Sequence, residues 1–405
     1  MTIFLYDEER VYSYNTLIED IQKANCYCSH FKTNNLYDYF LNLVIAVLAE
    51  KPLVLIDSDL NDLEIDGLND KIINQSTPIK PIIVSSFGDI LNKIQNSTSE
   101  ISIFTSGTTG QPKKVIHTLQ ILTRTLRISE NYSNQIWGFA YNPTHMAGLQ
   151  VFFQAFLNMN TLVNIFNQPR LRVYEAIDKY SITHISATPT FYRLLLPFEK
   201  SYFSVKRITF GGEKSDKKLH ESMLLIFPNA KINNIYASTE AGSLFSAKND
   251  YFLIPPTISS KIKVKENELL IHKSLLGKSE SFTFDGDYYC TGDLIEWINE
   301  AEGLFRFKSR KNELINIGGY KVNPTEVESL ILEIPDIIQV VVFGKANSIL
   351  GNILCAEVKI NESSSITELN IRNFLSDKLQ DFKIPRRIKF VDSFSITRTG
   401  KIKRI

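Results

Sequence analysis

Residues 103–118 read IFTSGTTGQPKKVIHT, in which hydroxyl residues and glycines fill positions 105–110 directly after an apolar run. Glycine allows backbone conformations that direct consecutive N–H groups at an anion, while serine and threonine add hydroxyl donors and lysine adds positive charge. The stretch therefore predicts a phosphate-binding loop. A polar turn between a strand and a helix is the alternative, and it would account for any four of these residues taken alone.

The stretch differs from two common phosphate-binding patterns. A P-loop requires Gly-Lys five residues after its first glycine, whereas Pro112 precedes Lys113 here. The spacing of Gly107 and Gly110 does not fit the dinucleotide-binding fingerprint either. A different scheme of phosphate binding is therefore indicated.

The composition limits the kind of protein that carries this loop. The chain has 405 residues, of which 43% are hydrophobic and 22% charged, so it is long enough for two or more domains. Its 45 lysines and arginines nearly balance its 44 aspartates and glutamates. Neither a nucleic acid nor an anionic membrane surface is indicated as a partner.

Cysteine usage and hydropathy indicate a reducing compartment. The four cysteines form no C-x-x-C pair, so we expect free thiols. No apolar run approaches 18 residues, and the N-terminal segment becomes acidic after a few apolar positions. We therefore expect neither a membrane span nor a signal peptide, and we predict a cytoplasmic protein.

Short β-type runs alternate with helix-period segments along most of the chain. The helical segments include residues 36–51 and 149–159. The expected strands are residues 52–57, 81–86, 101–105, 161–166, 183–188, 207–210 and 231–236. This alternation is typical of parallel β-α-β layers, so we expect an α/β fold.

The pattern changes near residue 310. A Gly-Gly turn precedes an expected helix over residues 324–332, with Asn323 as its N-cap and Pro324 as its first residue, and strand-like runs follow. We therefore expect a large N-terminal α/β domain over residues 1–309. A small α+β C-terminal domain is expected over residues 310–405.

Three short motifs follow or interrupt predicted strands. They are GGE (211–213), YASTE (236–240) and TGD (291–293). Open α/β sheets bind ligands at the carboxyl ends of their strands, and Asp293 is expected to present an exposed carboxylate that suits paired hydroxyls such as those of ribose. Each motif is weak alone, because such an aspartate is more often a turn former and a Thr-Glu pair more often a helix cap.

The order of the motifs is more specific than any one of them. TSGTTGQPKK, THMAG, FGGE, YASTE, TGDL, SRKNELINIGGYKVNPTEVE and TRTGKIKR follow one another over residues 103–404. This series resembles the core motifs of the adenylate-forming superfamily, which includes acyl- and aryl-CoA synthetases, free-standing adenylation domains and luciferases. The resemblance covers essentially the whole chain, although residues 1–100 match more loosely.

The resemblance implies a reaction in two steps. ATP and a carboxylic acid give an acyl-adenylate and pyrophosphate, and a thiol, usually that of CoA, then forms a thioester and releases AMP. The first step brings two anions together, so the site has to screen charge and hold the reactants in line. The implied cofactors are ATP, Mg²⁺ and CoA, and the C-terminal domain is implied to be mobile.

The resemblance also implies roles for residues at matching positions. Lys401 would bridge the substrate carboxylate and the α-phosphate as a point charge, Glu240 would hold Mg²⁺, and His145 would lie at the acyl pocket. An equal alternative for His145 is a buried core histidine whose hydrogen bonds are made within the protein. Lys401 lies in a basic tail, where a lysine would ordinarily be a solvated surface charge.

The nucleotide is implied to contact several motifs at once. Tyr236 would stack on adenine, Asp293 and Arg310 would hold the ribose hydroxyls, and Thr239 would contact phosphate. The residues implied to flank adenine and the acyl group are Gly211, Gly212 and Glu213. Those implied to form the mobile loop over the β- and γ-phosphates are Thr105, Ser106, Gly107, Thr108, Thr109, Gly110 and Lys113.

The hinge of the C-terminal domain is implied to lie over residues 310–313, with Asn312 near the pivot. Gly318 and Gly319 would then line the path of the thiol. Lys217 and Lys218 match no motif and are expected to be surface charges.

One segment bears on the substrate. Adenylation domains for α-amino acids have a segment similar to F-D-x-S at the position where this chain has YNPTHMAG (141–148). The aspartate of that segment pairs with the substrate ammonium group. No aspartate occurs in this segment. We therefore expect an aryl or aliphatic carboxylic acid without an α-amino group.

The sequence leaves three functions open. The first is an acyl- or aryl-CoA ligase, and the second is a stand-alone adenylation enzyme that loads the phosphopantetheine of an acyl carrier protein. The third is a nucleotide-binding homologue that has lost catalysis. The third is disfavoured because Lys113, Glu240, Asp293, Arg310 and Lys401 are all present.

Overall fold

The computed structural model describes residues 2–60, 65, 68, 71–105, 112–248, 251–317, 320–347, 351–361, 364–397 and 401–402. Five of the sequence-predicted phosphate-loop residues (Ser106, Gly107, Thr108, Thr109 and Gly110) lie outside the described residues, as do Gly318 and Gly319 of the predicted thiol path.

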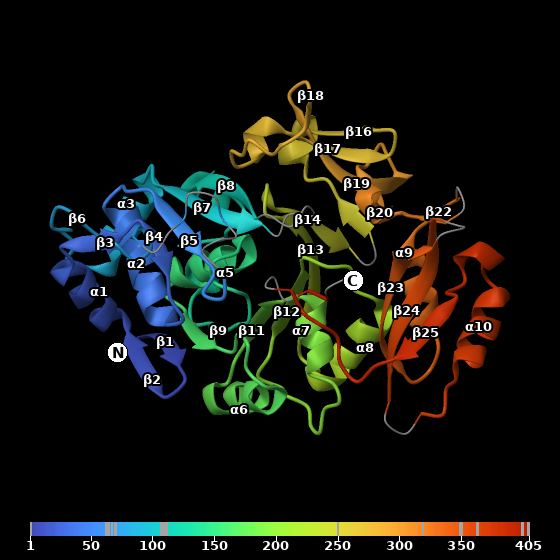
Figure 1. Cartoon of the computed structure of the whole chain (residues 1–405). Helices are drawn as coiled ribbons and strands as arrows, with labels where there is room; N and C mark the ends of the chain where they lie inside the picture. The colour runs from blue at the N-terminus through green and yellow to red at the C-terminus, as the bar shows by residue number, and fades with distance from the viewer. Residues whose placement is uncertain are drawn as a thin grey trace.

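One continuous sheet connects the centre of the molecule with its upper part in Figure 1. Its strands are β1 (Ile3–Asp7), β2 (Arg10–Ser13), β9 (Ile136–Phe139), β10 (Thr161–Asn164), β11 (His184–Ala187), β12 (Arg207–Gly211), β13 (Lys231–Ser238), β14 (Gly242–Lys248), β15 (Tyr251–Leu253), β16 (Ile262–Lys265), β17 (Glu268–His272), β18 (Phe284–Asp285), β19 (Tyr288–Asn299) and β20 (Leu304–Arg310). Their order is β16-β17-β19-β20-β15-β14-β13-β12-β11-β9-β10-β1-β2, with β18 paired to β19.

The sheet changes character at β13. The pairs from β1 through β10, β9, β11 and β12 to β13 are parallel, whereas the pairs from β13 through β14, β15, β20, β19 and β17 to β16 are antiparallel. The expected α/β fold is confirmed in the parallel part. The motif YASTE lies at the end of β13, where the two parts of the sheet meet.

A second sheet carries the residues on either side of the predicted phosphate loop. Its strands are β4 (His30–Lys32), β5 (Leu53–Ile56), β7 (Glu100–Thr105) and β8 (Lys113–Thr118), in the order β4-β5-β7-β8. β7 and β8 are antiparallel, and Thr105 is opposite Lys113. Residues 106–111 therefore connect two neighbouring strands, rather than a strand and a helix as the alternative from the sequence assumed. A small ladder pairs β3 (Cys26–Cys28) with β6 (Ser76–Pro78).

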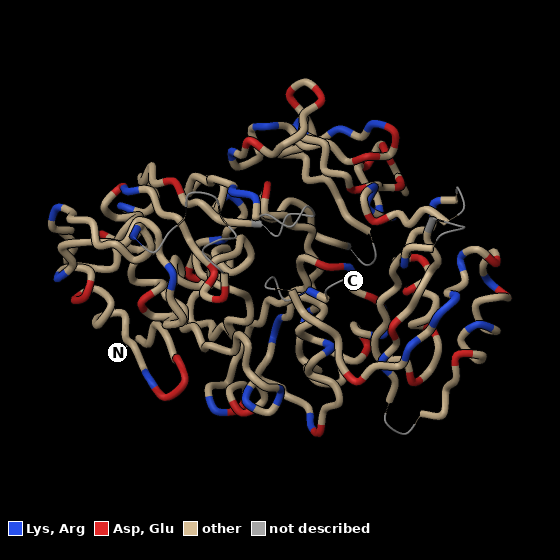
Figure 2. The backbone as a smooth tube through the Cα atoms, in the orientation of Figure 1, with Lys and Arg blue, Asp and Glu red and all other residues tan. Residues whose placement is uncertain are grey.

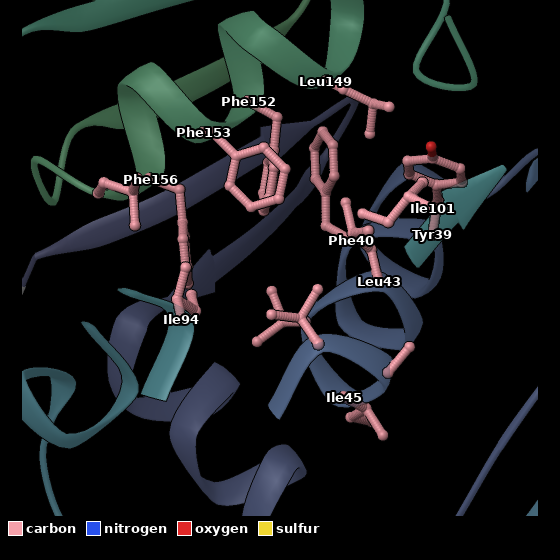
Figure 3. Close-up of a cluster of buried hydrophobic side chains, with 14 of the residues drawn as sticks. Tyr39, Phe40, Leu43, Ile45, Ile94, Ile101, Leu149, Phe152, Phe153 and Phe156 are labelled. Atoms are coloured by element: carbon pink, nitrogen blue, oxygen red, sulfur yellow. The ribbon is translucent and has the colours of Figure 1, made fainter. Parts of the chain in front are cut away.

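Helices cover these sheets and bury aromatic side chains between the layers. They are α1 (Tyr14–Lys23), α2 (Leu36–Leu48), α3 (Phe87–Asn96), α4 (Leu119–Thr123), α5 (Met146–Phe156), α6 (Arg170–Tyr180), α7 (Pro189–Leu194) and α8 (Lys217–Ile226). Figure 3 shows Phe40 of α2 facing Phe152 of α5, and the two rings stack with centroids 4.3 Å apart. This core fixes α5, whose N-terminus begins at the THMAG motif.

The C-terminal part of the chain has its own hydrophobic core. Its elements are β21 (Ile315–Ile317), β22 (Tyr320–Val322), α9 (Pro324–Ile331), β23 (Ile337–Asn347), β24 (Gly351–Ile360), α10 (Glu368–Ser376) and β25 (Arg387–Phe390). The side chain of Asn323 accepts a hydrogen bond from the Thr325 N–H, so the predicted N-cap is confirmed. Figure 1 shows the chain returning from this part to a C-terminus near the centre of the molecule.

One strand expected from the sequence is absent, and one expected surface lysine makes an additional contact. Residues 81–86 form no strand, although Ile82 and Val84 are buried and Ile83 is 85% exposed, as in an alternating strand. Lys217 and Lys218 are exposed, as expected, and Nζ of Lys218 also donates to the carbonyl of Ile337 (2.6 Å) in the C-terminal part. This contact holds α8 against the turn after α9.

The sequence also led to expectations about membrane-spanning helices, the distribution of charge and the state of the cysteines. No helix in the described part of the chain is long and apolar enough to cross a membrane. Figure 2 shows acidic and basic residues interspersed along the backbone, as the balanced composition predicts. Cys26, Cys28, Cys290 and Cys355 are all free thiols.

Candidate active site

Asp293, Tyr236 and Arg310 form one hydrogen-bonded group on three strands of the main sheet. Asp293 on β19 is opposite Arg310 at the end of β20. Its two carboxylate oxygens accept hydrogen bonds from the hydroxyl of Tyr236 on β13 (2.6 Å) and from Nε of Arg310 (2.6 Å). The structure thus brings these three residues together. Asp293 is only 5% exposed, however, so the prediction of an exposed carboxylate was wrong.

The charges of this group are strongly coupled. Burial disfavours the charge on Arg310, but the Asp293 carboxylate outweighs this effect and raises the pKa of the guanidinium. Burial, followed by the negative charge of Asp293, raises the pKa of Tyr236 well above its usual value. Tyr236 is therefore a neutral donor, and its ring stacks on Phe307 with centroids 4.5 Å apart.

The predicted metal ligand lies in the turn that joins β13 to β14. Thr239 and Glu240 follow the end of β13, and Gly242, with φ of 67°, begins β14. The negative charge of Glu240 acts on both Lys401 and Tyr236. No group of three or more acidic, histidine or cysteine side chains in the described residues is arranged to hold a metal.

Magnesium does not require such a group, because it usually keeps several waters and binds one or two carboxylates together with substrate phosphates. A single carboxylate, that of Glu240, fits this mode of binding. Glu240 is the residue that would hold the ion.

Lys401 lies in the middle of the site although it is the fifth residue from the end of the sequence. Its peptide N–H donates to the hydroxyl of Thr397 (3.1 Å), and the Thr397 N–H donates to the Lys401 carbonyl (2.6 Å). A Cβ atom on Gly212 would be 3.5 Å from Cε of Lys401. The lysine side chain therefore runs directly over the GGE motif.

Glu213 connects the C-terminal segment with the main sheet. One of its carboxylate oxygens accepts from the peptide N–H (3.0 Å) and the hydroxyl (2.7 Å) of Thr190 at the start of α7. The other accepts from the Ile402 N–H (3.3 Å). Burial lowers the pKa of Lys401, and the charges of Glu213 and Glu240 oppose this shift. These contacts keep the ammonium group beside acidic side chains in a half-buried site.

His145 is held by an acidic residue that the sequence did not indicate. It is the N-cap residue of α5, and its Nε2 is 2.8 Å from Oδ2 of Asp57, which follows β5. The other oxygen of Asp57 accepts from the hydroxyl of Thr144 (3.1 Å) and from the amide of Asn142. Burial disfavours the charge on Asp57, but these hydrogen bonds outweigh it and lower its pKa.

Glu268 is a second residue that the sequence did not single out. It is buried, its Oε1 accepts from the Gly292 N–H (2.8 Å), and its Oε2 is 2.6 Å from Nζ of Lys311. It thus joins the TGD motif to the predicted hinge. A lone glutamate at the start of an apolar strand gave no signal in the sequence, because surface strands commonly begin with a charge.

Comparisons with known proteins identify two family patterns in this chain. Residues 68–267 match the AMP-binding enzyme family, and residues 326–401 match the C-terminal domain of AMP-binding enzymes. The chain is 27% identical to the oxalate–CoA ligase of Saccharomyces cerevisiae over 350 residues, which are 76% of this chain and 63% of the yeast protein. It therefore spans less than two thirds of that ligase.

Two further similarities extend over more of the chain. It is 26% identical to the 2-succinylbenzoate–CoA ligase of Staphylococcus aureus over 386 residues, which are 86% of this chain and 73% of that protein. The o-succinylbenzoate coenzyme A synthetase of Bacillus subtilis, in complex with ATP and magnesium, superposes with a TM-score of 0.72 at 20% identity, covering 99% of this chain and 95% of that one. Because both family patterns and the fold agree, this chain belongs to the adenylate-forming superfamily of AMP-binding enzymes.

Proposed function

We propose that this protein is an AMP-forming acid-thiol ligase that activates a carboxylic acid with ATP and transfers the acyl group to CoA. The observation that carries the proposal is the position of Lys401 over Gly212, where the charges of Glu213, Glu240 and Arg310 act on it. The curated relatives from yeast and Staphylococcus aureus are named as CoA ligases, which supports CoA as the acceptor.

In the first step, a carboxylate oxygen of the acid attacks the α-phosphorus of ATP, and the bond to pyrophosphate breaks. Lys401 neutralises the charge that develops between the two anions, in a half-buried site where such an interaction is stronger than in water. Tyr236 and the Asp293–Arg310 pair hold adenine and ribose. Bound Mg²⁺ would supply charge neutralisation on the phosphates, and Glu240 would hold it.

In the second step, the thiol sulfur attacks the acyl carbonyl carbon, and AMP leaves with the bonding electron pair. Gly318 and Gly319 are proposed to line the path of the thiol. We assign the loop from Thr105 to Gly110, with Lys113, to the β- and γ-phosphates, Thr239 to a phosphate contact, and Gly211 to Glu213 to the junction of adenine and acyl group.

We place the boundary between the two domains at residues 309 and 310. The residues just before it, and Arg310 itself, belong to β20 of the main sheet, whereas β21 contacts the C-terminal sheet: the carbonyl of Asn316 accepts from Nδ2 of Asn352 (3.1 Å). We also assign the enzyme to the cytoplasm, because ATP and CoA are available there and its four free thiols remain reduced.

The acid is proposed to lack an α-amino group. Asp57 brings a carboxylate to the 141–148 segment, but His145, Asn142 and Thr144 already occupy both of its oxygens. An incoming ammonium group would have to displace these partners. His145 is proposed to lie at the acyl pocket, oriented by Asp57.

The function is tested with a panel of aryl, aliphatic and α-amino acids. We expect acid-dependent exchange of labelled pyrophosphate into ATP with aryl or aliphatic acids, and a CoA thioester in the product mass spectrum. Exchange driven only by amino acids would refute the proposed substrate class. Thioester formation on a phosphopantetheinylated carrier protein, but not on CoA, would show that the acceptor is a carrier protein and not CoA.

Replacing Glu240 by glutamine is expected to raise the Mg²⁺ concentration for half-maximal adenylation by about tenfold, corresponding to roughly 1.4 kcal/mol. Glutamine keeps the size of the side chain but removes the charge that attracts the ion. The measurement is pyrophosphate exchange across a Mg²⁺ titration at fixed ATP. Glu280→Gln, on the exposed surface, is the control, and an unchanged Mg²⁺ dependence in Glu240→Gln would rule out its assigned role.

A further inference from the structure

We propose that His117 and Arg124 are positioning residues that hold the Thr239–Glu240–Ala241 turn in register with the strand that follows the phosphate loop. This inference rests on the proposed function, in which Glu240 holds Mg²⁺. It concerns three consecutive backbone carbonyls of that turn, each of which accepts a hydrogen bond from another segment of the chain.

His117 holds the first carbonyl. It lies on β8, is fully buried, and its Nε2 is 2.8 Å from the carbonyl oxygen of Thr239. A carbonyl only accepts, so Nε2 carries the proton. Burial, with a smaller effect from the positive charge of Arg124, lowers the pKa of His117 to about 4, so the ring is neutral at physiological pH.

The second ring nitrogen of His117, Nδ1, shows that a histidine at this position carries an energetic cost. In the described part of the chain, Nδ1 of His117 is buried without a hydrogen-bond partner, and an unsatisfied buried polar atom is destabilising. The ring lies directly against Gly277, where a Cβ atom would come within 2.5 Å of it, so a larger residue at position 277 would displace the ring. An apolar side chain would avoid this cost, so the bond to Thr239 is the feature that distinguishes histidine at this position.

Gly277 and Arg124 hold the next two carbonyls. The Gly277 N–H donates to the carbonyl of Glu240 (2.8 Å). Arg124, which follows α4, donates from Nη2 to the carbonyl of Ala241 (2.7 Å) and from Nη1 to that of Leu275 (3.0 Å). Arg124 thus joins the turn to the segment that contains Gly277.

A pair of backbone hydrogen bonds also connects β8 with the segment that contains Gly277. The peptide groups of Ile116 and Lys278 exchange two hydrogen bonds, of 2.9 and 2.8 Å. Lys113 and His117 are four residues apart on β8, so they lie on the same face of the strand. The contacts therefore fix the metal-binding turn relative to the base of the phosphate loop, which is the geometry that a Mg²⁺–phosphate complex bound by both would require.

One measurement is the binding of Mg²⁺ with α,β-methylene-ATP, whose bridge between the α- and β-phosphorus atoms cannot be cleaved, so that it forms no acyl-adenylate. The other is the rate of each half-reaction of the full-length enzyme. His117→Leu removes the donor, whereas His117→Gln keeps a donor near the position of Nε2. We expect His117→Leu to weaken Mg²⁺-dependent nucleotide binding about tenfold, to leave the conversion of a supplied acyl-adenylate to thioester within about twofold of wild type, and to be largely rescued in His117→Gln.

A matched control is available at His184, which is also buried and has a pKa lowered to about 4, chiefly by burial. His184→Leu is expected to lower thermal stability without changing the Mg²⁺ dependence. Equal losses in both half-reactions of His117→Leu, or an unchanged Mg²⁺ dependence, would overturn the inference. If His117→Leu does not fold, Arg124→Met decides by the same two criteria.

These outcomes are separable from failure of the proposed function itself. If the wild-type protein shows no acid-dependent pyrophosphate exchange, the function is wrong. If it shows exchange and the variants bind nucleotide normally at every Mg²⁺ concentration, only the positioning role is wrong.

Discussion

Replacing Lys401 by alanine is expected to slow acyl-adenylate formation by about 10²- to 10³-fold, the loss that accompanies removal of one donor to developing transition-state charge. Conversion of a supplied acyl-adenylate to thioester should remain close to the wild-type rate. The selectivity follows from the position of Lys401, which lies over Gly212 on a C-terminal segment that meets the main sheet at Glu213. In the proposed cycle, the lysine would leave the site when the C-terminal domain rotates.

The two half-reactions have to be measured separately, by pyrophosphate exchange and by thioester formation from purified acyl-adenylate. Lys378→Ala is a suitable control, because Lys378 also belongs to the C-terminal domain but forms an ion pair with Glu333 away from the site. It should affect neither step. A Lys401→Ala variant that lost both steps equally would indicate damage to the fold or a wrong role.

The second large effect is expected from Asn312→Pro, which should leave adenylation largely intact while blocking transfer to the thiol. Asn312 is the middle residue of the short 3₁₀ helix Lys311–Glu313. Before it, Arg310 is anchored to Asp293 of the main sheet. After it, Ile315 is in close contact with Gly344 of the C-terminal sheet. We propose that a rotation of one domain against the other would be absorbed in the segment between these anchors.

Proline is tolerated in the first turn of a helix, which makes it compatible with the orientation seen here. It fixes φ at residue 312 and restricts Lys311 before it, so the segment loses the second backbone conformation that rotation requires. In the present orientation, Lys311 pairs with Glu268 and Lys218 bonds the Ile337 carbonyl. Both contacts would have to break when the domain rotates.

Single-turnover assays of each half-reaction test this prediction. Asn312→Ala serves as the control, because it removes the side chain without restricting the backbone, and it should retain both steps. Thioester formation at the wild-type rate by Asn312→Pro would show that the pivot lies elsewhere.

Much of the fold was predictable because its signals are local. Helix periodicity identified α2 and α5, and apolar runs identified six of the seven expected strands of the N-terminal part. The failure at residues 81–86 has a simple cause. Ile82 and Val84 alternate with exposed residues as in a strand, but a strand also needs a hydrogen-bonding neighbour, and β propensity does not report whether one is present.

The sequence by itself determined the motif positions and the Asn323 cap, because these depend on local turn chemistry. That Tyr236, Asp293 and Arg310 serve one nucleotide was implied by the resemblance of the motif series to a known family. Only the tertiary structure decided that Asp57 holds His145, that His117 and Arg124 hold carbonyls of the Glu240 turn, and that Glu268 and Lys218 connect the two domains. The partners in these contacts are 43 to 122 residues apart. Their proximity results from the order of strands in the sheets and the packing of helices, which no local pattern of residues encodes.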